Sequence, residues 1–132
     1  MRWTMDLHKL NRRIKCKPCP LPNVHDLLLK LEGFNYASAT DLNMGHCNIL
    51  LDEEACKMCT TIMPWGKHEH LRLPQGLANA PDIFQEEMNN LFHELEFVCC
   101  HADDLLVTNE GNCRDHLRKL EQVFSKLRCA GL

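Results

Sequence analysis

The sequence predicts a single α+β domain, in which helices and antiparallel strands are mixed without a regular strand–helix–strand alternation. Two stretches, one from Ala80 and one after Asn112, have the apolar spacing of amphipathic helices. Short apolar runs bounded by turn residues predict strands, and two of these runs flank Asp103 and Asp104. With 132 residues, 45% of them hydrophobic, the chain is long enough to bury one core.

The first third of the chain contains one predicted helix and one predicted strand. Asn23 is a suitable N-cap for a short helix over residues 24–32. Residues 34–40 have the composition of a strand, and this strand would place Asp41 at its end.

In the middle of the chain, two further strands are predicted over residues 47–51 and 56–63. The acidic residues 52–54 would form the turn between them. The run Pro64-Trp65-Gly66 predicts another turn, which leads into an extended segment over residues 68–73.

The two long predicted helices have clear local signals at their ends. Pro81 and Asp82 are favoured in the first turn of the helix that begins near Ala80. Its apolar stripe consists of Ile83, Phe84, Met88, Leu91, Phe92 and Leu95. The last helix begins after Asn112 and ends at Gly131. Its apolar positions are Leu117, Leu120, Val123, Phe124 and Leu127.

Between these helices the sequence predicts a hairpin with two carboxylates at its tip. Asp103 and Asp104 lie between the apolar runs 97–100 and 105–107. Adjacent carboxylates repel each other, and a divalent cation would stabilise both charges. Mg²⁺ prefers oxygen ligands, and Asp41 could supply one from another strand. The alternative is ordinary turn chemistry, because aspartate tolerates the backbone angles of a tight turn.

Charge is distributed unevenly along the chain, whose net charge is −3. Residues 1–30 carry +5, residues 31–112 carry −11 and residues 113–132 carry +3. A net-acidic chain is not an obvious nucleic-acid binder, because neutralising phosphates requires cations. An acidic middle between basic ends does suit a divalent metal held beside a polyanion. A solvated acidic face is the alternative.

The nine cysteines are expected to be reduced thiols or metal ligands. The N-terminus has no apolar signal core and no apolar run could span a membrane, so a cytoplasmic or nuclear location without membrane association is expected. Cys16-x-x-Cys19 and Cys56-x-x-Cys59 imitate a four-cysteine zinc site on two predicted extended segments. Unpaired thiols are the alternative. His25, His93 and His116 fall on predicted helices and are expected at the surface.

Five blocks occur along the chain in a characteristic order: residues 5–11, 20–22, 40–46, 73–85 and 101–106. Together they resemble the reverse transcriptase of gypsy-type long-terminal-repeat retrotransposons. The resemblance covers essentially the whole chain, and residues 73–85, which begin Leu-Pro-Gln-Gly, are its most specific part. It implies RNA-directed DNA polymerase chemistry on a right-hand palm, a ferredoxin-like antiparallel sheet backed by helices.

The resemblance also implies how the chain is divided. Residues 1–33 and about 47–78 correspond to fingers elements, and about 34–46 and 79–132 to palm elements, with no thumb. Such a chain would be a fragment of a retroelement polyprotein, within an intracellular particle, and weak or inactive alone. Its partners would be an RNA or DNA template-primer, deoxynucleoside triphosphates and the rest of the polyprotein.

Specific roles follow from the same resemblance. Asp41, Asp103 and Asp104 would be catalytic and would bind two Mg²⁺ ions, or alternatively Mn²⁺, about 3.5–4 Å apart. Gln75 and Gly76 would line the nucleotide pocket.

Three further residues of the implied nucleotide site depart from the family pattern. His8 replaces an arginine that grips the triphosphate, His46 replaces the aromatic residue beneath the sugar, and His101 replaces a tyrosine before the acidic pair. Imidazole is mostly neutral at pH 7 and lacks the fork of guanidinium, so His8 should hold phosphate less well. These departures suggest a decaying element copy. The alternatives are a small zinc-stabilised binding module without catalysis and an inert remnant of the polymerase fold.

Overall fold

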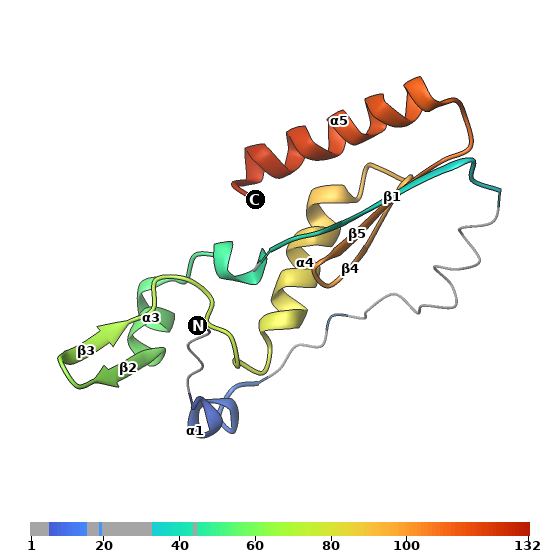
Figure 1. Cartoon of the computed structure of the whole chain (residues 1–132). Coiled ribbons are helices and arrows are strands. Elements are labelled where there is room, and N and C mark those ends of the chain that lie inside the picture. Colours follow the sequence, from blue (N-terminus) through green and yellow to red (C-terminus); the bar gives the residue numbers. More distant parts are fainter. Residues whose placement is uncertain (1–5, 16–18, 20–32, 44) are drawn as a thin grey trace.

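The computed structural model of the chain describes residues 6–15, 19, 33–43 and 45–132. The predicted helix over residues 24–32, His25 and Cys16 lie outside the described residues. In chain order the elements are α1 (His8–Asn11), β1 (Tyr36–Asp41), the 3₁₀ helix η1 (Gly45–Asn48), α3 (Glu53–Met58), β2 (Thr60–Met63), β3 (Gly66–Glu69), α4 (Ala80–Phe92), β4 (Val98–His101), β5 (Asp104–Asn109) and α5 (Cys113–Ala130) (Figure 1).

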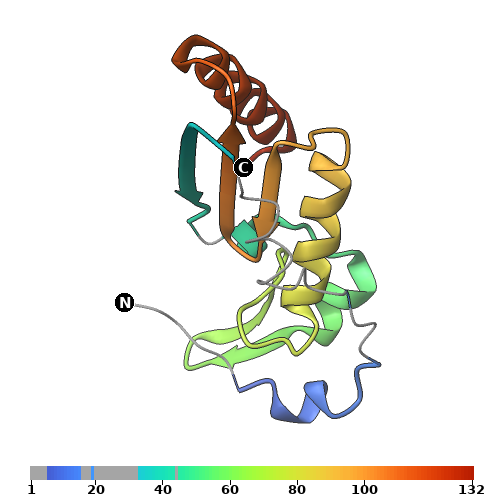
Figure 2. The same cartoon turned by 90° about the vertical axis from the view of Figure 1, so that its right-hand side faces the viewer.

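Strands β1, β5 and β4 form an antiparallel sheet with β5 at its centre, and Figure 2 shows them side by side in this order. The β1–β5 register runs from Tyr36–Asn109 to Asp41–Asp104. The β4–β5 register ends at His101–Asp104. The last residues of β1 and β4 therefore lie on either side of Asp104, at one end of the sheet.

The main core lies between this sheet and helices α4 and α5. Its buried residues are Phe84, Met88, Phe92, Cys100, Leu105, Val107, Val123 and Leu127. Helix α5 begins where the side chain of Asn112 accepts a hydrogen bond from the Asp115 N–H, and it ends at Gly131 with a left-handed φ of 81°. The α+β class, both long helices and the hairpin between β4 and β5 are as predicted from the sequence.

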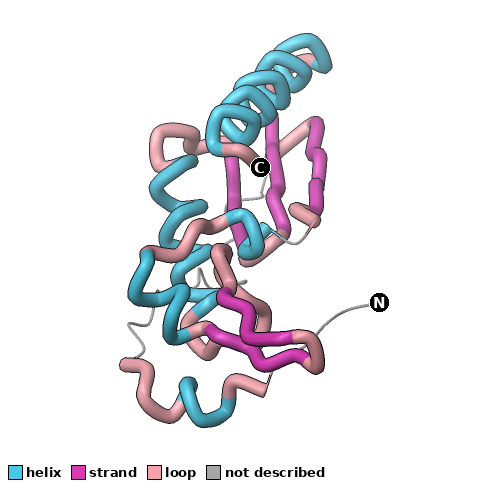
Figure 3. Tube along the Cα trace, turned by 90° about the vertical axis from the view of Figure 1, so that its left-hand side faces the viewer, coloured by secondary structure: helices cyan, strands magenta, loops and turns pink. Residues whose placement is uncertain are grey.

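A second cluster of buried residues joins the two-stranded unit to the beginning of α4. It contains Leu7, Cys59, Leu73, Leu77 and Ala80. Strands β2 and β3 form their own antiparallel pair around the predicted turn at Pro64 and Trp65. Figure 3 shows this hairpin apart from the three-stranded sheet.

The predictions for residues 47–63 were partly wrong. Residues 45–48 form a 3₁₀ helix in place of the start of a strand, and Leu50 makes only an isolated bridge with Arg72 among the described residues. The predicted acidic turn is the start of α3, because the Asp52 side chain accepts a hydrogen bond from Ala55 N–H at 2.7 Å. The short apolar pattern was a weaker signal than this N-cap and the acidic first turn that follows it.

Two other predictions need correction. The extended segment β3 ends at Glu69, short of the predicted residue 73. On α5, Leu117 and Phe124 are 59% and 46% exposed, whereas His116 is buried at 6%. The buried face of α5 is centred on His116, Val123 and Leu127, so the imidazole occupies a position where the sequence predicted a surface residue.

Candidate functional site

The first feature of the candidate site is a pair of aspartates on adjacent strands. Asp41, the last residue of β1, lies directly opposite Asp104, the first residue of β5. One step further along, the Leu42 N–H donates to the Asp103 carbonyl at 2.8 Å. This bond makes Asp41–Asp104 a non-hydrogen-bonded pair, in which Cα atoms are about 4.5 Å apart and side chains share one face. The register thus places the two predicted aspartates opposite each other.

The third aspartate lies in the turn that connects β4 to β5. Asp103 follows Ala102, which has a φ of 52°, a value that few residues other than glycine adopt. His101 and Asp104 close this two-residue turn as partners in the ladder. All three predicted aspartates and His101 are therefore at the same end of the sheet.

A residue that the sequence analysis had not assigned a role holds this turn. Gln85 on α4 is completely buried, and its Oε1 accepts a hydrogen bond from the Ala102 N–H at 2.8 Å. Its Nε2 donates to the Cys100 carbonyl at 3.2 Å and to Asn89 Oδ1 at 2.9 Å. The available signals were its place at the end of the 73–85 block and its position beside Phe84 of the apolar stripe of α4.

A cleft of about 480 Å³ adjoins the turn. It is lined by Ala102 and Asp103 from the turn and by three of the predicted nucleotide-site residues, His46, Gln75 and Gly76. The remaining lining residues are Leu77, Ala80, Pro81 and Phe84. The structure therefore places these three predicted residues around one cavity with an acidic side chain at its edge.

Gly45 allows the 3₁₀ helix that carries His46 to approach α4 closely. A Cβ atom on Gly45 would lie 2.5 Å from Cζ of Phe84. Because that distance is shorter than any ordinary contact, only glycine fits here without displacing the Phe84 ring.

His8 is separate from this group. It lies on α1 with an exposed side chain, and its Nδ1 is 3.0 Å from Asp6 Oδ1. Hydrogen bonds from the His8 backbone and side chain hold the pKa of Asp6 below its usual value. His8 is not among the residues that line the cleft.

Helix α1 reaches the rim of the cleft through Asn11, another residue that sequence reasoning missed. Its Nδ2 donates to the Gly76 carbonyl at 2.8 Å, and its Oδ1 accepts from the Ala78 N–H at 2.9 Å. This paired contact fixes the loop that carries Gln75 and Gly76.

The three aspartates have the donor chemistry that a hard divalent cation requires, because each supplies carboxylate oxygens. Asp41 and Asp104 are exposed and Asp103 is half-buried, so solvent reaches them. Among the described residues, no three histidine, cysteine, aspartate or glutamate side chains are gathered into a preformed metal site. Metal binding would require rotation of the exposed aspartate side chains.

Residues 1–132 match the sequence profile of one protein family, described as reverse transcriptase (RNA-dependent DNA polymerase). The chain belongs to the reverse transcriptase family. Enzymes of this family use divalent metal ions.

Relatives of this reverse transcriptase segment are polyproteins of mobile elements and viruses. It is 35% identical over 99% of its length to the retrovirus-related Pol polyprotein from transposon 297 of Drosophila melanogaster, and it covers 12% of that protein. It is 31% identical over 96% of its length to the Pol polyprotein from transposon gypsy, also covering 12%. It is 34% identical over 99% of its length to the enzymatic polyprotein of cauliflower mosaic virus (strain Strasbourg), and it covers 19% of that protein.

Solved structures show the same fold. The foamy viral protease–reverse transcriptase in complex with double-stranded DNA superposes with a TM-score of 0.88 at 24% identity, over 98% of this chain and 23% of that one. A second structure of that protein, in complex with an RNA/DNA hybrid, has a TM-score of 0.85 at 24% identity, over 95% of this chain and 17% of that one. The predicted polymerase fold is confirmed.

The described cysteines give no support to a zinc-stabilised module, because none of them is gathered with two other potential metal ligands. Cys56 lies on α3 and Cys59 at its C-terminal end, not on a strand as predicted, and both are buried. Burial raises the pKa of the Cys59 thiol, and the neighbouring Cys56 raises it further.

In the described part of the chain, no helix combines the length and the hydropathy that a membrane-spanning helix requires.

Proposed function

We propose that this segment supplies the nucleotidyl-transfer centre of an RNA-directed DNA polymerase, with Asp41, Asp103 and Asp104 as its catalytic, metal-binding carboxylates. The observation that carries the proposal is the β1–β5 register, which sets Asp41 opposite Asp104 with Asp103 in the adjoining turn. A divalent cation bound by these aspartates would stabilise their carboxylates as anions.

The cofactor we propose is Mg²⁺, with Mn²⁺ as the alternative. Two such ions, when bound, would lower the pKa of the primer 3′-hydroxyl and neutralise the departing pyrophosphate. Asp41 would approach the reacting atoms from β1, at the edge of the described sheet, whereas Asp103 lies in a turn that the buried Gln85 amide holds in place. The acids are thus supported by two different elements of the fold.

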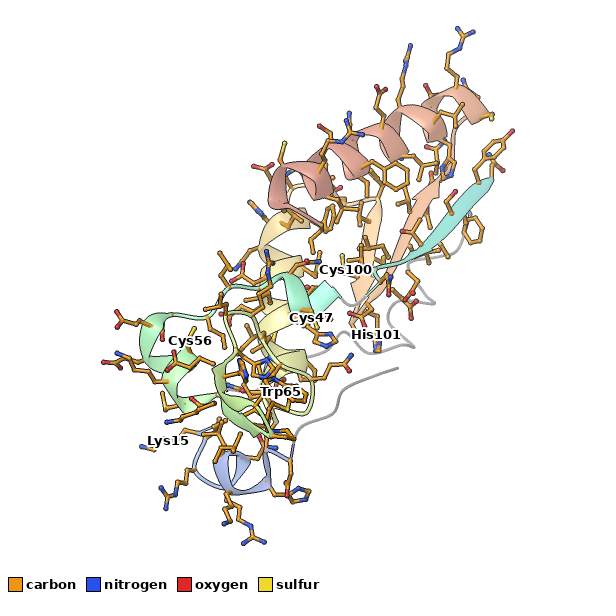
Figure 4. The ribbon with its side chains drawn as sticks, turned by 60° about the vertical axis from the view of Figure 1, so that its left-hand side comes forward. Lys15, Cys47, Cys56, Trp65, Cys100 and His101 are labelled. Carbon is orange, nitrogen blue, oxygen red and sulfur yellow. The ribbon has the colours of Figure 1, made fainter. Side chains whose placement is uncertain are left out.

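The incoming deoxynucleoside triphosphate would occupy the cleft beside Asp103, where His46 would lie beneath the sugar and Gln75 and Gly76 would line the pocket. The support is that these residues line one cavity. His101, which is labelled in Figure 4, would contribute to the nucleotide site from the end of β4, where it pairs with Asp104. His8, outside this cavity, would contact only the triphosphate end of a nucleotide that extends toward α1.

The template-primer would be RNA or DNA, and the remainder of a retroelement polyprotein would complete the grip on it. The role of the remaining polyprotein is supported by the relatives named above, which are polyproteins of which the chain spans 12–19%. We further propose that the unit around β2 and β3 belongs to the fingers and the three-stranded sheet to the palm. The two separate buried clusters support this division.

A second candidate, an inert remnant of the polymerase fold, is favoured by the state of His8. Its imidazole is already hydrogen-bonded to Asp6, and imidazole lacks the forked set of donors with which guanidinium holds a phosphate. We therefore expect weak activity from the isolated chain.

Primer extension on an RNA template, with Mg²⁺ or Mn²⁺, tests the proposal. We expect slow extension that Asp103→Asn abolishes and that Glu121→Gln, an exposed acid on α5, leaves unchanged. Paramagnetic broadening of the Asp41 and Asp104 amide signals by Mn²⁺ provides a readout that does not depend on turnover. Broadening without extension would favour the inert remnant, and absence of both would contradict the proposed metal site.

A further inference from the structure

The strand that carries Asp41 is weakly anchored by its own side chains. None of the six residues of β1 is buried, and four of them are exposed. Within the described residues β1 pairs only with β5, so its other edge is open. The register of such a strand is weakly specified, because no apolar side chain locks it to the core. A slip of two residues would place Ala39 or Asn43 opposite Asp104.

His116 provides an anchor that β1 itself lacks. Its Nε2 is joined to Ser38 Oγ by a hydrogen bond of 2.9 Å. Its ring also stacks on Tyr36, with centroids 5.9 Å apart and an angle of 26° between the planes. Both contacts are to β1, three and five residues before Asp41.

The helix that carries His116 is itself firmly placed. Val123 and Leu127 of α5 are buried in the main core, and the helix is capped at both ends. His116 Nδ1 is buried and has no hydrogen-bond partner among the described residues. A buried polar ring with one unpaired nitrogen needs a reason to be there, because an apolar residue would bury more favourably.

We infer that His116 is a positioning residue that fixes β1 in register against β5 and so keeps Asp41 opposite Asp104. Its importance for catalysis rests on the function proposed above. The register itself is a property of the fold and can be measured separately.

Amide hydrogen exchange of the full chain, monitored by NMR, tests this inference directly. The Leu42 N–H bonds to the Asp103 carbonyl and reports on the β1–β5 register at the acidic end. The Thr108 N–H bonds to the Phe97 carbonyl and serves as an internal reference for the β4–β5 ladder. His116→Phe keeps the ring and its stacking but removes the hydrogen bond, and Ser38→Ala removes the same bond from the other side.

We expect either variant to speed amide exchange at Leu42 by about three- to tenfold, because this factor corresponds to the loss of one hydrogen bond. Exchange at Thr108 should change little. The double variant should exchange no faster than the single ones, because both remove one interaction. His116→Gln, whose amide can bond to Ser38, should restore part of the protection.

Val123→Ala is the matched control, because it weakens α5 packing through a residue of the main core. It should affect Leu42 and Thr108 to a similar extent. The inference is overturned if the Leu42 amide exchanges in His116→Phe at the same rate as in the unmodified chain. It is also overturned if Val123→Ala speeds exchange at Leu42 relative to Thr108 as much as His116→Phe does. Mn²⁺ broadening at Asp41 should weaken in parallel with Leu42 protection. If the unmodified chain shows no such broadening, the proposed metal site fails, while the exchange result still decides the role of His116.

Discussion

The buried amide oxygen of Gln85 accepts a hydrogen bond from the backbone N–H of Ala102 at 2.8 Å. This bond links the middle of α4 to the turn that presents Asp103. Because Ala102 has a positive φ, the turn adopts a conformation that an alanine rarely takes alone. Helix α4 therefore stabilises the strained turn that contains Asp103 and directly precedes Asp104.

Replacing Gln85 with leucine should destabilise the protein by about 2–4 kcal/mol. The substitution leaves the Cys100 carbonyl, which is buried, and the Ala102 N–H, which is half-buried, without their partner. An unpaired buried group costs about 1–3 kcal/mol, and the half-buried N–H lies at the lower end of that range. Urea unfolding followed by circular dichroism measures the change. Glu87→Gln, at an exposed position on the same helix, should change stability by less than about 0.5 kcal/mol. Equal effects of the two substitutions would argue against a specific role for the Gln85 amide.

Gly45→Ala should destabilise the protein by about 1–3 kcal/mol, the usual range for overpacking. The new Cβ would lie 2.5 Å from Phe84 Cζ and would force the buried ring to move. Thermal unfolding of Gly45→Ala in the normal background and in a Phe84→Leu background checks the cause. If the contact is responsible, the alanine costs less where the ring is absent.

The link between Glu94 and Lys126 predicts a pH effect. The hydrogen bond from Lys126, at 2.9 Å, and its charge hold the pKa of Glu94 below its ordinary value, and His93 adds a smaller effect. A lowered folded-state pKa means that the contribution of the pair is present above the ordinary glutamate range and is lost as pH falls through the folded pKa.

Lys126→Met should therefore raise the pKa of Glu94 toward its ordinary value, as measured by NMR titration of the Glu94 side chain. Arg118→Met, which removes a different exposed cation of α5, should leave the pKa of Glu94 unchanged. A Glu94 titration unchanged by Lys126→Met would show that the ion pair does not form in solution.

Cys100 should be unreactive in the folded protein. Burial, with a smaller contribution from Cys99, raises the pKa of its thiol to about 12, so almost no thiolate is present at neutral pH. Alkylation with iodoacetamide at pH 7.5, followed by peptide mass spectrometry, should label the exposed Cys113 and Cys129 well before Cys100. In denaturant the rates should become similar. Fast labelling of Cys100 under native conditions would mean that β4 is not packed as described.

The sequence by itself was sufficient for those features that local signals specify. Pro81 and Asp82 marked the start of α4, Asn112 and Gly131 marked the ends of α5, and the acidic pair between apolar runs predicted the β4–β5 turn. These signals involve residues close together in the chain, and so no tertiary information is needed to interpret them. The ordered motifs also identified the family.

The secondary structure of residues 47–63 was harder to predict from the sequence, because a short apolar run fits a strand and a buried helix equally well. There the Asp52 side chain caps a helix by accepting a hydrogen bond from the Ala55 N–H. Other features arise only from contacts between distant segments: Asp41 with Asp104, Gln85 with Ala102, and His116 with Ser38. The sequence alone determined the family, the two long helices and the acidic turn. Only the tertiary structure decided which polar side chains are buried and what they hold in place, because such bonds depend on strand register and helix packing rather than on neighbours in the chain.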